Sequence, residues 1–220
     1  TLVIRPMRDG VVSDFEATEQ LLRAMLKRAG SRTLRRPRLL VCIPSDTTEV
    51  ERRAVQESAR AAGSRDVHLV TKPLAGALGA ELPIEEPVAS VIVDIGGGRT
   101  EVAVISLGGT VVSRSIPVAG DAMDDAIMGW MRRERGLQIG ERTAENLKHR
   151  IGCASVEHQP GQMRVRGRDL ETGAPREVDV ASTDMCDALA HPVQRIRDIV
   201  IQALGETPPE PSADIVDRGI

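Results

Sequence analysis

Three consecutive glycines that follow an aspartate are the residues of this sequence best suited to chemistry. Asp94-Ile95-Gly96-Gly97-Gly98 ends a stretch rich in valine and isoleucine. A two-residue hairpin turn needs at most two residues with a positive φ, so three glycines exceed its requirement. Without Cβ atoms in the way, their N–H groups can surround a phosphate, and Asp94 can hold a water bound to a metal ion. The alternative is a flexible turn, and the glycines alone do not decide between the two.

Three short strands must position this loop. The segments 89–95, 101–107 and 110–116 are rich in β-branched residues, which favours an antiparallel meander. We expect Gly108-Gly109 to form the two-residue loop of the second hairpin. The glycines at 96–98 then lie in the first turn, where a buried strand ends.

Hydrophobic spacing and capping residues predict alternating strands and helices before the meander. In order, they are a helix over 15–29 capped by Ser13 or Asp14, a strand over 39–44, a helix over 48–63 capped within 45–48, a strand over 66–71 and a short helix over 74–80. The first strand is a continuous apolar run, so we expect protein to cover both of its faces. Strand, helix and strand form a βαβ unit, which makes the two strands parallel.

Helices dominate the prediction after the meander. The elements are a helix over 122–135 closed by Gly136, a helix over 144–152 capped by Thr143, a hairpin over 163–180 that turns at Thr172-Gly173, and a helix over 181–205. Residues 214–220 resemble the approach to a further strand. Glu145 and Lys148 lie three positions apart on one helix face, where they can form a surface ion pair or bind a ligand together. The alternation of elements along the whole chain predicts an α/β fold.

Composition excludes several classes of function. The net charge is −3 and the only aromatic residues are Phe15 and Trp130, which argues against a nucleic-acid partner. Three widely spaced cysteines favour a reducing compartment, and the four histidines share no metal-binding spacing with them. Without a long apolar run or a signal peptide, we expect a cytoplasmic protein. The segment between the first predicted helix and the first predicted strand is basic, with Arg32, Arg35, Arg36 and Arg38. This basic connection is either a solvated linker or a weak contact with the inner membrane surface.

Five segments, in order and with natural spacing, carry a resemblance to a known family. They are residues 5–15, 50–55, 94–98, 100–107 and 139–145. Together they resemble the MreB family of bacterial actin homologues, the rod-shape-determining cytoskeletal proteins. The resemblance covers nearly the whole chain. It implies an actin-like fold of two lobes that binds ATP and magnesium, forms membrane-associated filaments and organises cell-wall synthesis.

The resemblance also assigns parts and roles within this sequence. Residues 1–73 would be part of an incomplete first lobe, 74–120 with 192–220 the core of the second lobe, and 121–191 its outer subdomain. Asp94 would lie beside the magnesium ion. The residues that would bind the nucleotide are Gly96, Gly97, Gly98 and Arg99 at the phosphates, and Glu145, Asn146, Leu147 and Lys148 at the adenosine.

Two substitutions depart from the family pattern at catalytic positions. Lys72 stands where the family has a glutamate before the proline that corresponds to Pro73, and Arg99 stands where it has a threonine. A glutamate can orient or deprotonate the attacking water, whereas a protonated lysine can do neither. Both cations could still neutralise phosphate charge. We therefore expect little or no ATP hydrolysis.

Two nucleotide-binding segments of the family lie outside these 220 residues, so we also expect weakened ATP binding. Three functions remain open. The first, which we favour, is an MreB-like cytoskeletal protein that assembles with itself or with a full-length homologue and works with the cell-wall synthesis machinery. The second is an ATP-dependent enzyme of the same superfamily, a sugar kinase or chaperone ATPase, which needs a catalytic acid near the glycine loop. The third is a non-functional remnant whose incomplete sheet exposes an unpaired edge.

Overall fold

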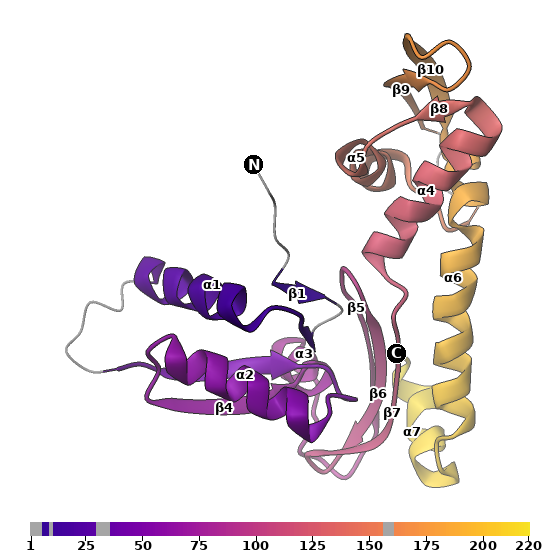
Figure 1. Cartoon of the computed structure of the whole chain (residues 1–220). Coiled ribbons are helices and arrows are strands. Elements are labelled where there is room, and N and C mark those ends of the chain that lie inside the picture. Colours follow the sequence, from indigo (N-terminus) through magenta and orange to yellow (C-terminus); the bar gives the residue numbers. More distant parts are fainter. Residues whose placement is uncertain (1–5, 9–10, 30–35, 156–160) are drawn as a thin grey trace. The chain divides into compact units, whose positions relative to one another are not determined.

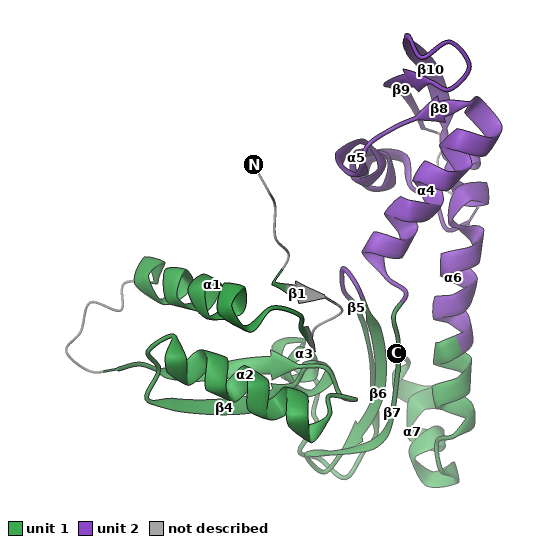
Figure 2. Ribbon diagram, in the orientation of Figure 1, with its two compact units in different colours: residues 1–95, 99–117, 199–220 green, residues 96–98, 118–198 purple. Residues whose placement is uncertain are grey.

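A computed structural model describes residues 6–8, 11–29, 36–155 and 161–220. The chain forms two compact units, shown in Figure 2: unit 1 comprises residues 1–95, 99–117 and 199–220, and unit 2 comprises 96–98 and 118–198. All of 121–191, the predicted outer subdomain, lies in unit 2. The predicted division of the chain into two lobes and an outer subdomain stays a prediction. Arg32 and Arg35 of the basic connection lie outside the described residues.

Figure 1 labels the helices and strands in chain order. Unit 1 contains β1 (Met7–Arg8), β2 (Val11–Val12), α1 (Phe15–Arg28), β3 (Arg38–Ile43), α2 (Glu49–Ala61), β4 (Asp66–Thr71), α3 (Lys72–Gly79), β5 (Ser90–Ile95), β6 (Thr100–Ser106), β7 (Gly109–Ile116) and α7 (Pro209–Arg218). Unit 2 contains α4 (Gly120–Arg135), β8 (Leu137–Gln138), α5 (Glu141–Ile151), β9 (Gln162–Asp169) and β10 (Pro175–Ala181). Helix α6 (Ser182–Gly205) belongs to both.

The predicted βαβ unit is confirmed, with one correction. Strands β3 and β4 pair in parallel, and α2 connects them. The prediction that both faces of β3 are covered is wrong, because its residues alternate between outside and inside and Leu40 is 70% exposed. Such alternation shows that protein packs on one face only. The described sheet has two strands, β3 and β4.

The predicted meander is also confirmed, and helices pack on both of its faces. Strands β5, β6 and β7 pair antiparallel in that order. On one face, Val102 and Val104 pack with Ile199 and Ala203 of α6. On the other, Ala103 and Ile105 pack with Ala77 of α3 and with Ile84. Burial on both faces explains why every residue of β6 except Ser106 is buried.

The second hairpin turns one residue earlier than predicted. Leu107 and Gly108 have φ values of 51° and 71°, while Gly109 already pairs with Ser106. Two consecutive residues with positive φ are typical of a type I′ turn, which matches the twist of the flanking strands. Strand pairing therefore places Leu107 in a conformation that costs a non-glycine residue free energy.

Unit 2 encloses a hydrophobic core of its own. Helix α4 ends at Gly136 with φ 58°, as predicted, and the β9–β10 hairpin turns at Gly173 with φ 72°. The two-residue strand β8, too short for a periodic signal, adds a third strand to this hairpin.

The prediction that Thr143 caps a helix is wrong. Helix α5 begins at Glu141, three residues earlier than predicted, with Gly140 as its cap, and the Thr143 N–H donates to the Gly140 carbonyl.

Residues 209–218 form helix α7, so the prediction of an approaching strand is wrong. Proline is compatible with the first turn of a helix, because that position needs no N–H partner. Asp214 accepts a hydrogen bond from the Ala89 N–H at 2.8 Å, and Ile215 packs against the core of the meander. These long-range contacts, which no local pattern encodes, favour the helix.

Candidate functional site

The glycine loop joins β5 to β6, and the pairing of Ile95 with Thr100 closes it. Gly96, Gly97 and Gly98 are not among the described glycines with a positive φ. A Cβ added at Gly97 would meet only the Asp121 carboxylate oxygens, at 3.8 and 3.9 Å, which is an ordinary contact. Neither the backbone conformation nor internal packing therefore requires glycine at position 97. The absent side chain leaves room for a close ligand, as a phosphate loop needs.

Carbonyl groups of the loop cap the first turn of α4. The Gly120 N–H donates to the Gly96 carbonyl at 3.1 Å, and the Asp121 N–H donates to the Gly97 carbonyl at 2.7 Å. The cap residue of α4 is an alanine and contributes no side-chain hydrogen bond. The loop therefore satisfies two of the helix's free N–H groups itself, which fixes the loop against the positive end of the helix dipole.

The side chain of Lys148, in α5, contacts the first residues of α4. Its Nζ donates to the Gly120 carbonyl and to Asp124 Oδ2, both at 2.9 Å, and the side chains of Lys148 and Asp124 are only 17% and 15% exposed. A Cβ at Gly120 would lie 3.3 Å from this Nζ. The other carboxylate oxygen, Asp124 Oδ1, is buried without a hydrogen-bond partner in the described part of the chain. A cation and a buried acceptor thus lie together beside the glycine loop.

The other residues predicted to face adenosine lie elsewhere on α5. Glu145 does not pair with Lys148; its side chain is 58% exposed, and its carboxylate is 3.9 Å from His149 Nε2. Asn146 is exposed, and Leu147 is completely buried in the core of unit 2. Only Lys148 among the four residues has a described contact with the start of α4.

Sequence analysis did not identify Asp124 as a partner of Lys148. The two residues are 24 positions apart and lie on different helices, so no spacing rule connects them. Two acidic neighbours in the start of α4, Asp121 and Asp125, make Asp124 look like part of a solvated helix face. Only its contact with the Lys148 ammonium group distinguishes Asp124 from these acidic neighbours.

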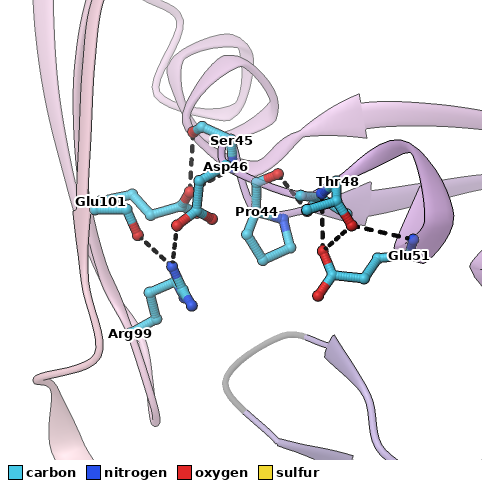
Figure 3. A network of polar contacts seen from close by, with 9 residues as sticks. Pro44, Ser45, Asp46, Thr48, Glu51, Arg99 and Glu101 are labelled. Carbon is cyan, nitrogen blue, oxygen red and sulfur yellow. Dashed lines mark hydrogen bonds and ion pairs between the residues drawn. The ribbon is translucent and has the colours of Figure 1, made fainter.

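Arg99, the residue after the glycines, lies in a polar network of unit 1 (Figure 3). Its Nη1 is 2.5 Å from Asp46 Oδ2 and 2.7 Å from Ser115 Oγ. Beside this pair, Glu101 Oε1 accepts hydrogen bonds from the Ser45 N–H at 2.6 Å and from Ser45 Oγ at 2.9 Å. Asp46 and Glu101 were not predicted as site residues, because they are far apart in sequence and no spacing rule connects them.

Strand register places Asp94 in this row of polar residues. Asp94 lies opposite Glu101, which lies opposite Ser115, across the three strands of the meander. Asp94 is half-buried. The described residues contain no cluster of three or more His, Cys, Asp or Glu side chains that could hold a metal ion. Asp94 alone would therefore hold magnesium only through water, together with oxygens from a bound phosphate.

Lys72 is the first residue of α3 and is half-buried. A positive charge is unfavourable at a helix N-terminus, because the helix dipole is positive there. The ammonium group and the dipole both attract anions. This position therefore suits the neutralisation of a phosphate better than the activation of a water molecule.

The family is established by a match along the whole chain. A family model described as MreB/Mbl protein matches residues 1–220. The chain belongs to the MreB/Mbl family. Among similar proteins, cell shape-determining protein MreB of Escherichia coli strain K12 is 48% identical over 219 residues, which are 99% of this chain and 63% of that protein. Cell shape-determining protein Mbl of Bacillus subtilis strain 168 is 41% identical over 220 residues, or 100% of this chain and 66% of that protein.

Solved structures agree on the fold. Spiroplasma citri MreB 5 bound to AMPPNP superposes with a TM-score of 0.93 at 38% identity, over 99% of this chain and 66% of that chain. A MamK double helical filament has a TM-score of 0.78 at 22% identity, over 94% of this chain and 63% of that one, and supports the fold alone. This MreB/Mbl chain therefore has the predicted actin-like α/β fold. It spans about two thirds or less of the length of these relatives.

Proposed function

We propose that this MreB/Mbl chain acts as a filament-forming cytoskeletal protein that takes part in determining cell shape. The observation that carries the proposal is the family match over all 220 residues. Relatives that are 48% identical to it over 219 residues are cell shape-determining proteins. Assembly with further copies or with a full-length homologue is part of this proposal for a chain of the MreB/Mbl family.

The proposal extends to an adenine nucleotide bound at the glycine loop. The related MreB 5 was solved with AMPPNP and with ADP. Gly96, Gly97 and Gly98 would hold phosphate, Lys148 would contact the nucleoside, and Asp94 would hold magnesium through water. Magnesium, when bound, neutralises phosphate charge. We also propose that ATP binding is weak.

We further propose that hydrolysis is slow or absent. Lys72 and Arg99 supply positive charge but no carboxylate to orient a water molecule. An ATP-dependent enzyme, the second function that the sequence left open, needs such a group. The protein would work in the cytoplasm, with the cell-wall synthesis machinery at the membrane. None of the described helices is long and apolar enough to cross a membrane.

A thermal melt with and without magnesium-ATP tests nucleotide binding, and Gly97→Ala tests the loop. ATP at about 100 times its dissociation constant should stabilise the wild type by about 2.7 kcal/mol. The structure has room for the new Cβ, so the variant should fold normally. Its ATP-dependent shift should fall by at least half, because the methyl group occupies the space needed by a phosphate.

Gly205→Ala is a matched control for this measurement. Its added Cβ meets nothing within 4 Å, so stability should stay the same or rise by up to about 1 kcal/mol, while the ATP shift should stay near the wild-type value. A wild type that melts cooperatively without any ATP shift would contradict nucleotide binding. An undiminished shift in Gly97→Ala would rule out the loop as the phosphate site, and sustained phosphate release from ATP would contradict the absence of hydrolysis.

A further inference from the structure

Arg99 directly follows the glycine loop, yet a carboxylate of the same chain holds its guanidinium group. Its ion pair with Asp46 measures 2.5 Å, and the side chain of Arg99 is only 15% exposed. Ser115 Oγ lies 2.7 Å from the same nitrogen. The cation that the sequence assigned to a phosphate therefore already has an anionic partner.

Hydrogen bonds hold the backbone around Asp46, so the Asp46 carboxylate stays close to Arg99. The neighbouring Ser45 donates two hydrogen bonds, from its N–H and from its Oγ, to Glu101 Oε1, and Glu101 is only 1% exposed. On the other side of Asp46, the Thr47 Oγ donates to the Pro44 carbonyl at 2.6 Å. Figure 3 shows this turn beside Glu101 of β6 and Arg99, the residue that precedes β6. Asp46 is thus held close to Arg99 without depending on the ion pair.

A phosphate group can compete with Asp46 for this guanidinium. Arginine binds phosphate and carboxylate oxygens with the same planar arrangement of N–H groups. The Asp46 side chain is 53% exposed, and an ion pair with such an exposed partner is weak because water screens it. A multiply charged phosphate that binds Arg99 can therefore displace Asp46, although the displacement costs part of its binding free energy.

We propose that Asp46 regulates the nucleotide site by competing with a nucleoside phosphate for Arg99. The inference rests on the proposed nucleotide binding and adds a residue that sets its strength. In the free protein, Arg99 pairs with Asp46. When a nucleoside di- or triphosphate binds, Arg99 transfers to a phosphate oxygen and Asp46 faces water. Asp46 is accordingly a positioning residue that lowers affinity.

Equilibrium binding of magnesium-ATP to Asp46→Asn tests this competition. The variant should bind about threefold to fivefold more tightly, because the phosphate no longer displaces a charged partner. Asp46→Glu, which keeps the charge, should bind like the wild type. Asp66→Asn removes the same charge from another exposed ion pair of unit 1, that of Arg65 with Asp66, and should change affinity by less than about twofold.

The decisive comparison uses Arg99→Gln as a second background. There, Asp46→Asn should give no gain, because the two residues act through one interaction and their effects are not additive. An equal gain in both backgrounds, or none in the wild type, overturns the inference while nucleotide binding stands. If the folded wild type, Asp46→Asn and the control all fail to bind ATP, the proposed nucleotide binding fails, and this inference fails with it. A thermal melt of each variant establishes that it is folded.

Discussion

Glu101 connects the turn at 44–46 to the central strand of the meander. It is 1% exposed, and one of its oxygens accepts both hydrogen bonds from Ser45. Oε2 is buried without a hydrogen-bond partner in the described part of the chain. Buried acceptors are costly to desolvate, so the two hydrogen bonds of Oε1 must compensate for this cost. Replacing Glu101 should therefore reveal how firmly the turn is held.

Glu101→Ala should lower the free energy of unfolding by about 2–3 kcal/mol, because the Ser45 N–H and hydroxyl lose their acceptor inside the protein. Glu101→Gln keeps a carbonyl oxygen at the Oε1 position and should lose less than about 1 kcal/mol. Urea unfolding at neutral pH measures both values. Equal losses would show that packing, and not the hydrogen bonds to Ser45, determines the role of this side chain.

In unit 2, the Cys186 thiol has a raised pKa. Burial, together with a hydrogen bond to Cys153, raises the pKa of Cys186 to about 11. The thiolate is the reactive form of cysteine, so this side chain stays protonated and unreactive at neutral pH.

Helix α2 illustrates how an element is fixed by its first turn. The Thr48 side chain accepts a hydrogen bond from the Glu51 N–H, and the Glu51 carboxylate accepts one from the Thr48 N–H, which together form a capping box. Hydrogen bonds from the Thr48 backbone and then from its side chain hold the pKa of Glu51 below its ordinary value of 4.5. The cap also ends the turn that carries Asp46.

Thr48→Ala should lower the free energy of unfolding by about 1 kcal/mol at pH 7, the usual effect of a lost helix cap. Because the pKa of Glu51 is lowered in the folded state, its contribution is complete above pH 4.5 and is lost as the pH falls through the folded pKa. The penalty should therefore be smaller near pH 3. Thermal melts of wild type and variant at both pH values measure it, and an unchanged penalty would exclude the carboxylate from the cap.

In the described part of the chain, each hydrophobic core consists of residues from one unit. Helices α4 and α5 and the β8–β9–β10 sheet enclose the core of unit 2, together with part of α6. The meander and its covering helices enclose the cores of unit 1. Cores that share no residues can open separately, since each loses its own buried surface.

Leu147→Ala tests this independence. The side chain is completely buried, so truncation should cost about 2–5 kcal/mol. Hydrogen exchange should accelerate in β9 and β10 and stay slow in β5 and β6. Val104→Ala, at an equally buried position in unit 1, should give the opposite pattern. Faster exchange in both units with either variant would show that the chain unfolds as one cooperative body.

The sequence by itself determined the elements with a strong local signal and the family. Local signals depend only on residues that are near neighbours in sequence. These signals are the spacing of apolar residues, the caps at Asp14 and Thr48, and the glycine turns. The βαβ unit and the meander could therefore be predicted. The motifs at 94–98 and 139–145 identified the family before any geometry was known. Periodicity failed where tertiary contacts override local preference, as in α7.

Tertiary structure alone decided which side chains meet at the candidate site. Asp124 and Lys148 are 24 positions apart, and Asp46 and Arg99 are 53 apart. No periodicity extends over such separations, because the register of strands and the packing of helices set these contacts. The glycine loop could therefore be predicted from its residue types, whereas the partners of its neighbouring cations could not. A cation's role depends on the group that faces it, and only the folded chain supplies that group.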